Sequence, residues 1–324
     1  MTDTAAHDGD VDRLDGPVIH GFGSAAVDFR VQTADLGPDY RDKLLGQTVT
    51  LLGGGAVANF LVQVCRLGGR ARWLGKIGAD WVGRTIVREL EAEGVDCGGV
   101  IVDPDACSPF NVAVYAGEKR RRVGGFLLPN SLAAIGGEDT AQLAGLVQAG
   151  DVLMVELGEI PLETCRSLAE VCAAKGARVV VDVDLDPVVQ CRGSRADVEA
   201  ILGVADVVMP NRAAMSTLYP GLSAAALTAR LVADFGRPAV VTAGEEGAYF
   251  AEPGRAVSHQ EATPIEAVDT VGAGDAFHGG AVFALAAGMT LADAVALGAR
   301  CGAANCLSPG ARTGMPTAAQ LGLL

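Results

Sequence analysis

The residues best suited to chemistry lie in one short run near the C-terminal end of the chain, from Asp269 to Gly280. Gly272, Ala273 and Gly274 carry almost no side chain, so the backbone there can approach a ligand closely. The small residues that follow indicate a helix, and the free N–H groups and dipole at a helix start favour an anion. The run therefore predicts an anion site.

Asp275 adds a carboxylate to this run. It has little use as a binding group in a site for anions, but it could take the proton from a hydroxyl that attacks phosphorus. The alternative is that Asp275 only caps the helix. The first interpretation predicts phosphoryl transfer, and the residues alone leave both open.

The run from Asp269 to Gly280 resembles the C-terminal motif of the ribokinase-like (PfkB) carbohydrate kinases, Asp-Thr-x-Gly-Ala-Gly-Asp followed by a small-residue helix. It matches at every defining position. The resemblance implies an ATP-dependent phosphotransferase that phosphorylates a hydroxyl, in the first place a primary alcohol, of a sugar or sugar derivative. It implies that Asp275 is the general base, that the Gly272 to Gly274 amides form the anion hole, and that ATP and Mg²⁺ are cofactors.

A second run, 53–59, resembles the family's Gly-Gly-x-x-x-Asn substrate motif. Gly54 and Gly55 let the backbone come near a sugar, and the Asn59 amide can both donate to and accept from hydroxyls. Gly-rich helix starts are frequent, so the motif is weak evidence by itself. The neighbourhood of Asn59 also differs from that of ribokinases proper, so ribose is not assumed.

Two acidic positions complete the expected acceptor site. Asp28, which we expect at the end of the first strand, matches an acid that grips sugar hydroxyls in the family. Open α/β sheets bind ligands at the carboxyl ends of their strands, which fits this placement. Glu159 follows a strand and resembles a substrate-facing position, with Glu156 as a rival for that role.

The nucleotide end rests on two weaker resemblances. The run 242–247 resembles the family's Thr-x-Gly-x-x-Gly turn, which implies nucleotide contacts at Thr242, Gly244 and Gly247; a plain hairpin turn is the alternative. Asn211 begins the family's Asn-x-x-Glu motif, which organises magnesium and phosphate through water, but Ala214 replaces its glutamate.

The resemblance also implies a monovalent cation such as K⁺. The candidate ligands are Asp269, Val271 and the carbonyls of the loop 307–314. Hard cations prefer oxygen ligands, and a loop rich in Gly and Pro exposes carbonyls. Gly314 occupies a place where some relatives have a hydroxyl residue.

The composition limits the classes of molecule that this protein is expected to bind. The net charge of −14 and the pI of about 4.7 argue against a general binder of nucleic acid or anionic membranes, and the one basic run, 119–122, fits a solvated hairpin turn. The eight cysteines form no Cys-x-x-Cys pair and predict reduced thiols. Residues 1–16 predict a disordered leader without a signal peptide, and no stretch is long and apolar enough to span a bilayer, so we expect a cytoplasmic protein.

Alternating strand and helix patterns predict βαβ units, with a mostly parallel sheet covered on both faces. The expected strands are 18–29, 71–77, 151–156, 178–184, 205–210 and 238–242, and the expected helices are 55–67, 81–93, 162–175 and 224–235.

Two segments, 30–52 and 96–128, break this rhythm. Their short extended pieces at 48–52, 99–102, 110–115 and 122–128 predict one small antiparallel sheet, and ribokinase-like kinases carry a lid at these places. The expected fold is thus a ribokinase-like three-layer α/β sandwich, with a core of 17–29, 53–95 and 129–324. Since an exposed sheet needs its open face covered, we expect the lid to close on substrate and to pair in a homodimer.

Rival functions remain at this point. Gly21–Ala26 imitates a dinucleotide motif, but no clear helix follows it, and no P-loop sequence exists. A sugar or nucleotide sensor without catalysis would explain Ala214 but not Asp275. A nucleoside kinase of the same fold is the closest alternative, with Phe110, Tyr115 or Phe126 as stacking candidates.

Two further positions bear on the substrate and the chemistry. Asp186 stands where several sugar-acid and ketose kinases have an arginine, so an anionic substrate loses one expected partner. His278, one turn beyond Asp275, is expected to pack in the helix or lie beside the ligand, because no nucleophile motif accompanies it.

Overall fold

The computed structural model describes residues 16–34, 46–117 and 121–323. Its centre is an eight-stranded sheet in the order β14-β13-β12-β11-β10-β9-β1-β4. These strands are β1 (Val18–Phe22), β4 (Arg70–Leu74), β9 (Val152–Glu156), β10 (Arg178–Asp182), β11 (Val207–Val208), β12 (Ala239–Thr242), β13 (Ala248–Ala251) and β14 (Ser258–Gln260). The neighbouring strands from β4 to β12 pair in parallel, and β13 pairs antiparallel with both β12 and β14. The predicted mostly parallel sheet is confirmed.

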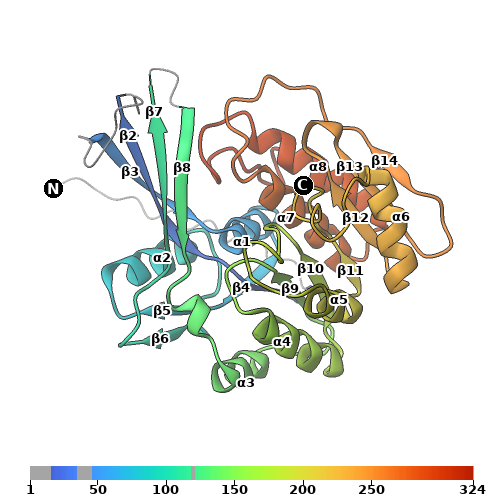
Figure 1. Ribbon diagram of the computed structural model, residues 1–324, viewed down its shortest axis with the longest axis horizontal. Helices are drawn as coiled ribbons and strands as arrows, with labels where there is room; N and C mark the ends of the chain where they lie inside the picture. The colour runs from blue at the N-terminus through green and yellow to red at the C-terminus, as the bar shows by residue number, and fades with distance from the viewer. Residues whose placement is uncertain (1–15, 35–45, 118–120, 324) are drawn as a thin grey trace.

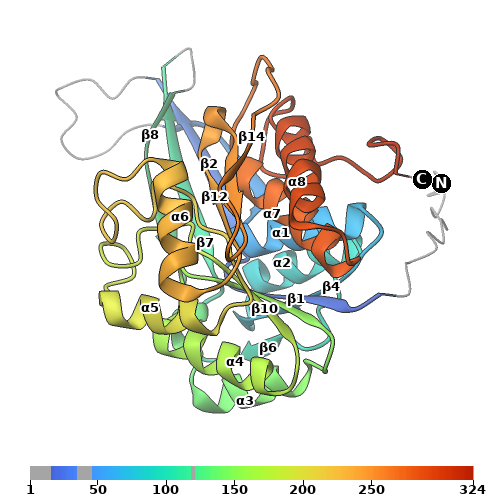
Figure 2. The same cartoon turned by 90° about the vertical axis from the view of Figure 1, so that its right-hand side faces the viewer.

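Helices cover both faces of this sheet (Figures 1 and 2). On one face α1 (Ala56–Arg66), α7 (Ala273–Ala286) and α8 (Leu291–Asn305) pack against one another. The other face carries α3 (Gly137–Gly145), α4 (Leu162–Ala174), α5 (Arg195–Val204) and α6 (Ala224–Phe235). All five residues of β9 are buried, as expected of a strand with helices on both sides. The three-layer sandwich is therefore confirmed.

A separate four-stranded sheet stands apart from the core, in the order β3-β2-β7-β8 (Figure 1). It consists of β2 (Ala26–Thr33), β3 (Gly46–Gly54), β7 (Phe110–Ala116) and β8 (Arg121–Leu128); we call it the lid sheet. It is not wholly antiparallel as expected, because β2 and β7 pair in parallel. The chain passes through α1 and α2 (Trp81–Ala92) between these two strands, and such a crossover lets it return in the same direction.

The lid boundaries also differ from the expectation. The segment 18–29 is not one strand: β1 ends at Phe22, and β2 starts at Ala26 in the lid sheet. The chain turns at Gly23, where a Cβ would lie 2.5 Å from a carboxylate oxygen of Glu156, so glycine is needed. Asp28 therefore lies in the lid sheet and not at the end of a core strand.

The expected strand pieces at 71–77 and 99–102 are corrected as well. The first divides into β4 and β5 (Lys76–Gly78), and β5 pairs with β6 (Ile101–Asp103) in a two-stranded sheet outside the lid. The expected leader lies outside the described residues except for Gly16, and so do residues 119 and 120 of the basic run 119–122.

The two faces of the lid sheet differ in polarity. Side chains alternate along β2, so Asp28 and Arg30 share one face while Phe29 lies on the other. Phe29 packs edge-on against Trp81 of α2 at 6.1 Å and against Phe110 at 5.6 Å between ring centroids, which joins the base of the lid to the core. Farther along the sheet, several large apolar side chains are exposed, namely Val49, Leu51, Val123, Phe126 and Leu127. None of the helices in the described part of the chain could cross a membrane.

Candidate active site

The run with the anion-site pattern does begin a helix. Gly272 is the N-cap of α7 and has φ 78°, a left-handed conformation that suits glycine, and a Cβ there would lie 2.2 Å from the Ala311 carbonyl oxygen. The amides of the first helical turn have no acceptor within their own helix. One of them is engaged nearby, because the Ala273 N–H donates to the Thr270 carbonyl over a long 3.3 Å.

Asp275 lies in the first turn of α7 but does not cap it. Its carboxylate accepts a hydrogen bond of 2.7 Å from the Asn59 side chain of α1. Burial, followed by the negative charge of Asp184, raises the pKa of Asp275 to about 7, and the Asn59 hydrogen bond opposes this rise. A carboxylate that titrates near neutral pH is matched to proton transfer, so the geometry favours a base over a cap.

Asn59 has both ends of its amide engaged. Its Nδ2 donates to Asp275, while its Oδ1 accepts a 2.6 Å hydrogen bond from the guanidinium of Arg312. The same arginine donates to the Gly54 carbonyl at 2.9 Å. The predicted residues Gly54, Asn59 and Asp275 are therefore brought together, and Arg312 joins them from the loop after α8.

Asp28 reaches this place from the lid sheet. It accepts a 2.9 Å hydrogen bond from Asn111 on the neighbouring strand β7. A Cβ on Gly54 would lie 2.3 Å from Asp28, which explains glycine at that position. Gly55, the next residue, is the N-cap of α1 with φ 91°.

The two candidate glutamates separate clearly. Glu156 is fully buried, and its Oε2 accepts hydrogen bonds of 2.8 Å from both the backbone and the hydroxyl of Ser24, so it ties β1 to β9. Glu159 has a buried Oε2 with no hydrogen-bond partner among the described residues. Burial and the charge of Asp28 raise the pKa of Glu159 to about 7. Of the two glutamates, Glu159 is the one with a side-chain oxygen that lacks a partner among the described residues.

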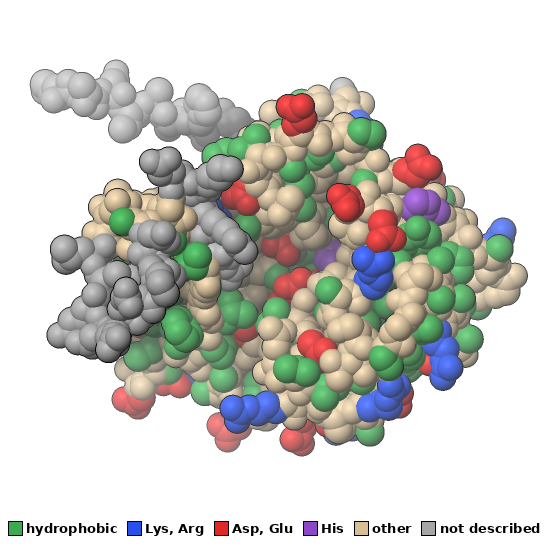
Figure 3. Space-filling model, turned by 45° about the horizontal axis from the view of Figure 1, so that its top comes forward, with side chains coloured by type: hydrophobic (Ala, Val, Ile, Leu, Met, Phe, Trp, Pro, Cys, Tyr) green, Lys and Arg blue, Asp and Glu red, His purple; other side chains and the backbone are tan. Residues whose placement is uncertain are grey.

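Two aspartates lie at and just beyond the end of β10. His278 contacts Asp182, with 3.1 Å between Nδ1 and Oδ2, and both side chains are buried. Burial opposes the charged imidazole, but Asp182 outweighs it and raises the pKa of His278. Burial, together with the charge of Asp182, raises the pKa of Asp184 to about 6. His278 packs beside the site, as predicted, and Figure 3 shows acidic side chains and a histidine in a hollow between the lid and the body.

The predicted nucleotide residues also meet. Asn211 pairs with Thr242 in an isolated parallel bridge. Thr242 ends β12 and leads into a 3₁₀ turn at Gly244–Glu246, which closes with a 2.8 Å hydrogen bond from the Ala243 N–H to the Gly247 carbonyl. Gly244 and Gly247 both have positive φ, at 60° and 90°. This is a turn built by the backbone.

The model of the pfkB family carbohydrate kinases matches residues 19–318. The chain belongs to this family. It is therefore a carbohydrate kinase, a phosphotransferase that acts on an alcohol group. A fructokinase from Klebsiella pneumoniae is 31% identical over 297 residues, covering 87% of this chain and 93% of the relative. A ribokinase from Lactococcus lactis is 24% identical and covers 91% and 92%.

Solved structures agree on the fold. A ribokinase from Thermotoga maritima aligns with a TM-score of 0.80 at 22% identity, covering 95% of this kinase and 98% of that chain. A putative ribokinase from Agrobacterium tumefaciens aligns with a TM-score of 0.76 at 28% identity, covering 93% and 95%. The ribokinase-like architecture is confirmed.

The expected ligands of a monovalent cation do converge in this kinase, but they meet protein donors. The Asp269 carboxylate accepts from the N–H groups of Val271 and Gly310, at 3.0 and 2.9 Å, and lies 3.5 Å from the Arg30 guanidinium. The carbonyls of Val271 and Ala311 both accept from the buried Asn305 amide, each at 3.1 Å.

Gly314 leaves no room for a hydroxyl residue in this arrangement. A Cβ at that position would lie 2.5 Å from the Asn305 carbonyl oxygen. An amide N–H₂ and a guanidinium thus stand at the oxygens that K⁺ would bind, so these oxygens already have protein donors in this structure.

Sequence reasoning missed two residues of the site. Arg312 was considered only as part of the loop 307–314, and Asn111 only as part of an expected lid strand. Period-two alternation offered a signal for Asn111, because it is polar between two apolar neighbours. Nothing local distinguishes Arg312, whose partners lie more than 250 positions away.

Proposed function

We propose that this kinase transfers the γ-phosphoryl group of ATP to a hydroxyl of a sugar or uncharged sugar derivative, in the first place a primary alcohol. One observation carries the proposal: the half-buried Asp275 carboxylate lies in the first turn of α7, accepts a hydrogen bond from Asn59, and has a pKa of about 7. Solved relatives support ATP as donor, since a ribokinase from Arabidopsis thaliana binds ribose and ATP and one from Cryptococcus neoformans binds ADP.

In this proposal Asp28 and Asn59 bind hydroxyls of the acceptor, with Glu159 and Gly55 beside them. Asp275 takes the proton of the attacking hydroxyl, and the amides of Gly272 to Gly274 stabilise the charge on the transferred phosphoryl group. Thr242, Gly244, Gly247 and Asn211 contact the nucleotide. The phosphoryl group is transferred from the nucleotide end of the site to the acceptor end.

Magnesium fits this site as a companion of the nucleotide. The described residues contain no cluster of three or more His, Cys, Asp or Glu side chains that could cage a metal. Mg²⁺ commonly keeps its waters and binds through phosphate oxygens, and its charge then offsets that of the phosphates. Asn211, whose Oδ1 accepts from the Ala214 N–H at 2.7 Å, is the side chain that the family motif assigns to this water network.

The charges of the acceptor end favour a neutral sugar. Glu159 and Asp28 are close enough for their charges to interact, and Asp186 replaces an arginine that anionic substrates use in relatives. An acid or phosphate group on the acceptor would meet like charges. A neutral polyol would instead satisfy the unpartnered oxygen of Glu159.

A nucleoside acceptor is the weaker candidate. Phe110 packs edge-on against Phe29, away from Asp28, and the strand register places Phe126 on that same outer face. Tyr115 lies under the Arg30 guanidinium, 5.9 Å from the ring centroid. Two of the three stacking candidates therefore face away from the acceptor end.

The exposed apolar side chains of the lid sheet support a homodimer. Val49 is 60% exposed and Phe126 68%, and the strand register places both on the face opposite Asp28 and Arg30. Burying such a face against a second copy would remove apolar area from water. We further propose that the kinase acts in the cytoplasm.

The test is Asp275→Asn, assayed with ATP against a panel of ketoses, aldoses, sugar acids and nucleosides. Loss of a positioned base should slow turnover roughly 10²- to 10⁴-fold, while nucleotide binding measured by calorimetry stays near the parent value. Near-parent turnover in the folded variant would reject Asp275 as the base. A parent protein that consumes no ATP with any acceptor would favour a sensor.

A further inference from the structure

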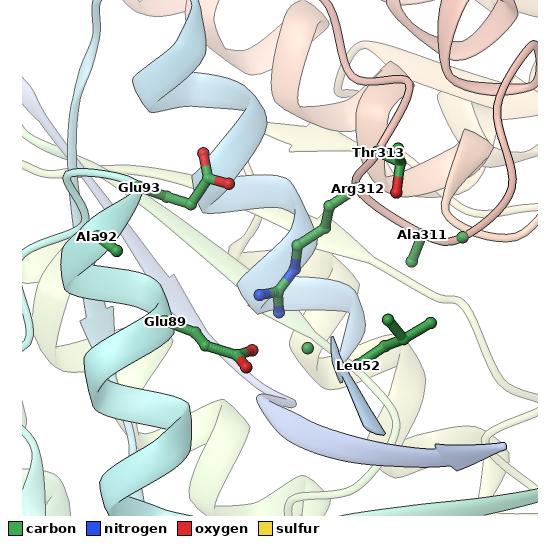
Figure 4. Close-up of a pocket in the computed structure, with 9 residues that line it drawn as sticks. Leu52, Glu89, Ala92, Glu93, Ala311, Arg312 and Thr313 are labelled. Atoms are coloured by element: carbon green, nitrogen blue, oxygen red, sulfur yellow. The ribbon is translucent and has the colours of Figure 1, made fainter. Parts of the chain in front are cut away.

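Arg312 is a cation behind the acceptor end that the proposed chemistry does not use. It extends from the loop after α8 towards Glu89 of α2, between Leu52 and Glu93 (Figure 4). Burial lowers the pKa of Arg312, against the opposing pull of Glu89 and Glu93. A buried guanidinium is costly unless its donors are used, and two of its nitrogens donate to Asn59 and Gly54.

The backbone of Arg312 is fixed as firmly as its side chain. Arg66 of α1 donates to the carbonyls of Arg312 and Met315 at 2.6 and 3.0 Å. Glu93 in turn accepts two hydrogen bonds from Arg66, at 2.9 and 2.6 Å. The loop that carries Arg312 is therefore held against α1, the helix that carries Asn59.

The guanidinium of Arg312 leaves no room for a side chain at position 53, although a cavity lies beside it. A Cβ on Gly53 would lie 2.3 Å from Nη1 of Arg312 and 2.5 Å from Glu89. Glycine at 53 thus has a reason separate from any contact with a sugar. A cavity of about 260 Å³, lined by Leu52, Glu89, Glu93 and Arg312 among others, lies on this side of the guanidinium.

We propose that Arg312 is a positioning residue for phosphoryl transfer, which fixes the Asn59 amide in the orientation that donates to Asp275. The inference rests on the proposed role of Asp275 as the base. An amide can point either its oxygen or its N–H₂ group at Arg312, but a guanidinium only donates. The oxygen of Asn59 must therefore face Arg312, which leaves the N–H₂ group for the base.

This orientation controls the base because the other charged groups around Asp275 do not depend on Arg312. Asp182 and Asp184 face it from the end of β10 and beyond, and His278 faces it from α7 itself. They stay in place when Arg312 is removed. The Asn59 hydrogen bond and the charge of His278 both lower the pKa of Asp275, but only the hydrogen bond depends on Arg312, so a freed Asn59 amide raises that pKa. The charge of Arg312 also interacts with Asp275, and Arg312→Lys retains that charge.

The test measures kcat/KM against pH for Arg312→Ala, with and without guanidinium chloride at non-denaturing concentrations. Because the variant loses a charged partner, its kcat/KM should decrease roughly 10- to 100-fold. The acid limb of its pH profile should shift to higher pH by about half to one unit. Guanidinium entering through the cavity should restore part of the rate and move the limb back, while tetramethylammonium chloride should not. Arg312→Lys keeps the charge but not the fork of donors, so a smaller shift in the same direction is expected.

The matched control is Arg178→Ala. Arg178 also donates to a single distant backbone carbonyl, that of Leu285 at 3.0 Å, on the side of the molecule away from this loop. Its removal should leave the pH profile unchanged, and guanidinium should not raise its rate. If guanidinium raised both variants alike, the rescue would be nonspecific and the proposal would fall.

A double-mutant cycle separates positioning from folding. In an Asn59→Ala background the amide is already absent, so adding Arg312→Lys should cost almost nothing further in kcat/KM. Additive losses, or a parent-like pH limb in folded Arg312→Ala and Arg312→Lys, would overturn the inference. A fully active Asp275→Asn variant would instead reject the base itself, which distinguishes the two failures.

Discussion

The two ends of the site are built in different ways. At the acceptor end, side chains from four separate elements bond to one another: Asp28 to Asn111, and Arg312 to Asn59. At the nucleotide end the backbone of one turn supplies most of the predicted contacts. The nearby ion pair between Arg212 and Glu246 is exposed. An exposed pair contributes little. The comparison teaches that side-chain identity should matter at the acceptor end and backbone conformation at the nucleotide end.

Among the changes that compare the two ends of the site, Asp28→Ala should have the largest effect. Losing a half-buried charged partner commonly costs about 1 to 3 kcal/mol, so the KM for the acceptor should rise about tenfold or more. The KM for ATP should stay within experimental error, because the nucleotide turn lies at the other end. Steady-state kinetics with each substrate varied in turn decides this. A weaker ATP constant with an unchanged acceptor constant would reverse the two ends.

Gly247→Ala should produce a smaller, opposite pattern. A Cβ there would lie 2.1 Å from the Gln260 carbonyl oxygen, and φ is 90°. Such strain costs about 1 to 3 kcal/mol, so the KM for ATP should rise severalfold and that for the acceptor should not. Gly244→Ala is the matched control: its φ is also positive, but a Cβ meets nothing within 4 Å. Equal effects of the two changes on the KM for ATP would argue against a role for the backbone conformation of this turn in nucleotide binding.

Asp275→Asn should also change how stability depends on pH. The pKa of Asp275 in the folded protein, about 7, lies above its value of roughly 4 in an unfolded chain. The folded protein therefore holds the proton more tightly, and the parent loses stability as pH rises from about 4 to 7. The variant lacks this loss, so its Tm should exceed that of the parent at pH 8 more than at pH 4.5. A difference independent of pH would contradict a buried, titrating carboxylate.

The smallest effect concerns potassium. Because Asn305 and Arg30 stand at the oxygens that K⁺ would bind, replacing K⁺ with tetramethylammonium at constant ionic strength should change kcat/KM by less than about twofold. Activation well beyond that by K⁺, and not by Na⁺, would show that these protein donors give way to the ion.

Local pattern predicted the parts of this kinase that depend on local contacts. Period and turn signals placed α1, α4 and α6 within two residues of their bounds. The break at Gly23 was missed, because the apolar run continues through it and only the packing of Glu156 requires a turn. Ala214 was identified as a departure, and its side chain is buried rather than presented to solvent. Arg312 escaped because its meaning lies in contacts across the fold.

The lid sheet meets the body closely where β2 and β3 leave the core, and this contact bears on which acceptors the site can bind. Ala26 pairs with Gly54 where β2 and β3 leave the core, and a Cβ on Gly55 would lie 2.6 Å from backbone atoms of Ser24 and Ala25. Asp28 lies just beyond this contact, on the lid, while Asn59 stays on the body. An acceptor bound by both Asp28 and Asn59 would connect the lid sheet to the body. The enzyme would then select its substrate by length. A molecule too short to contact both Asp28 and Asn59 would not connect the lid to the body, and its hydroxyl would remain in water.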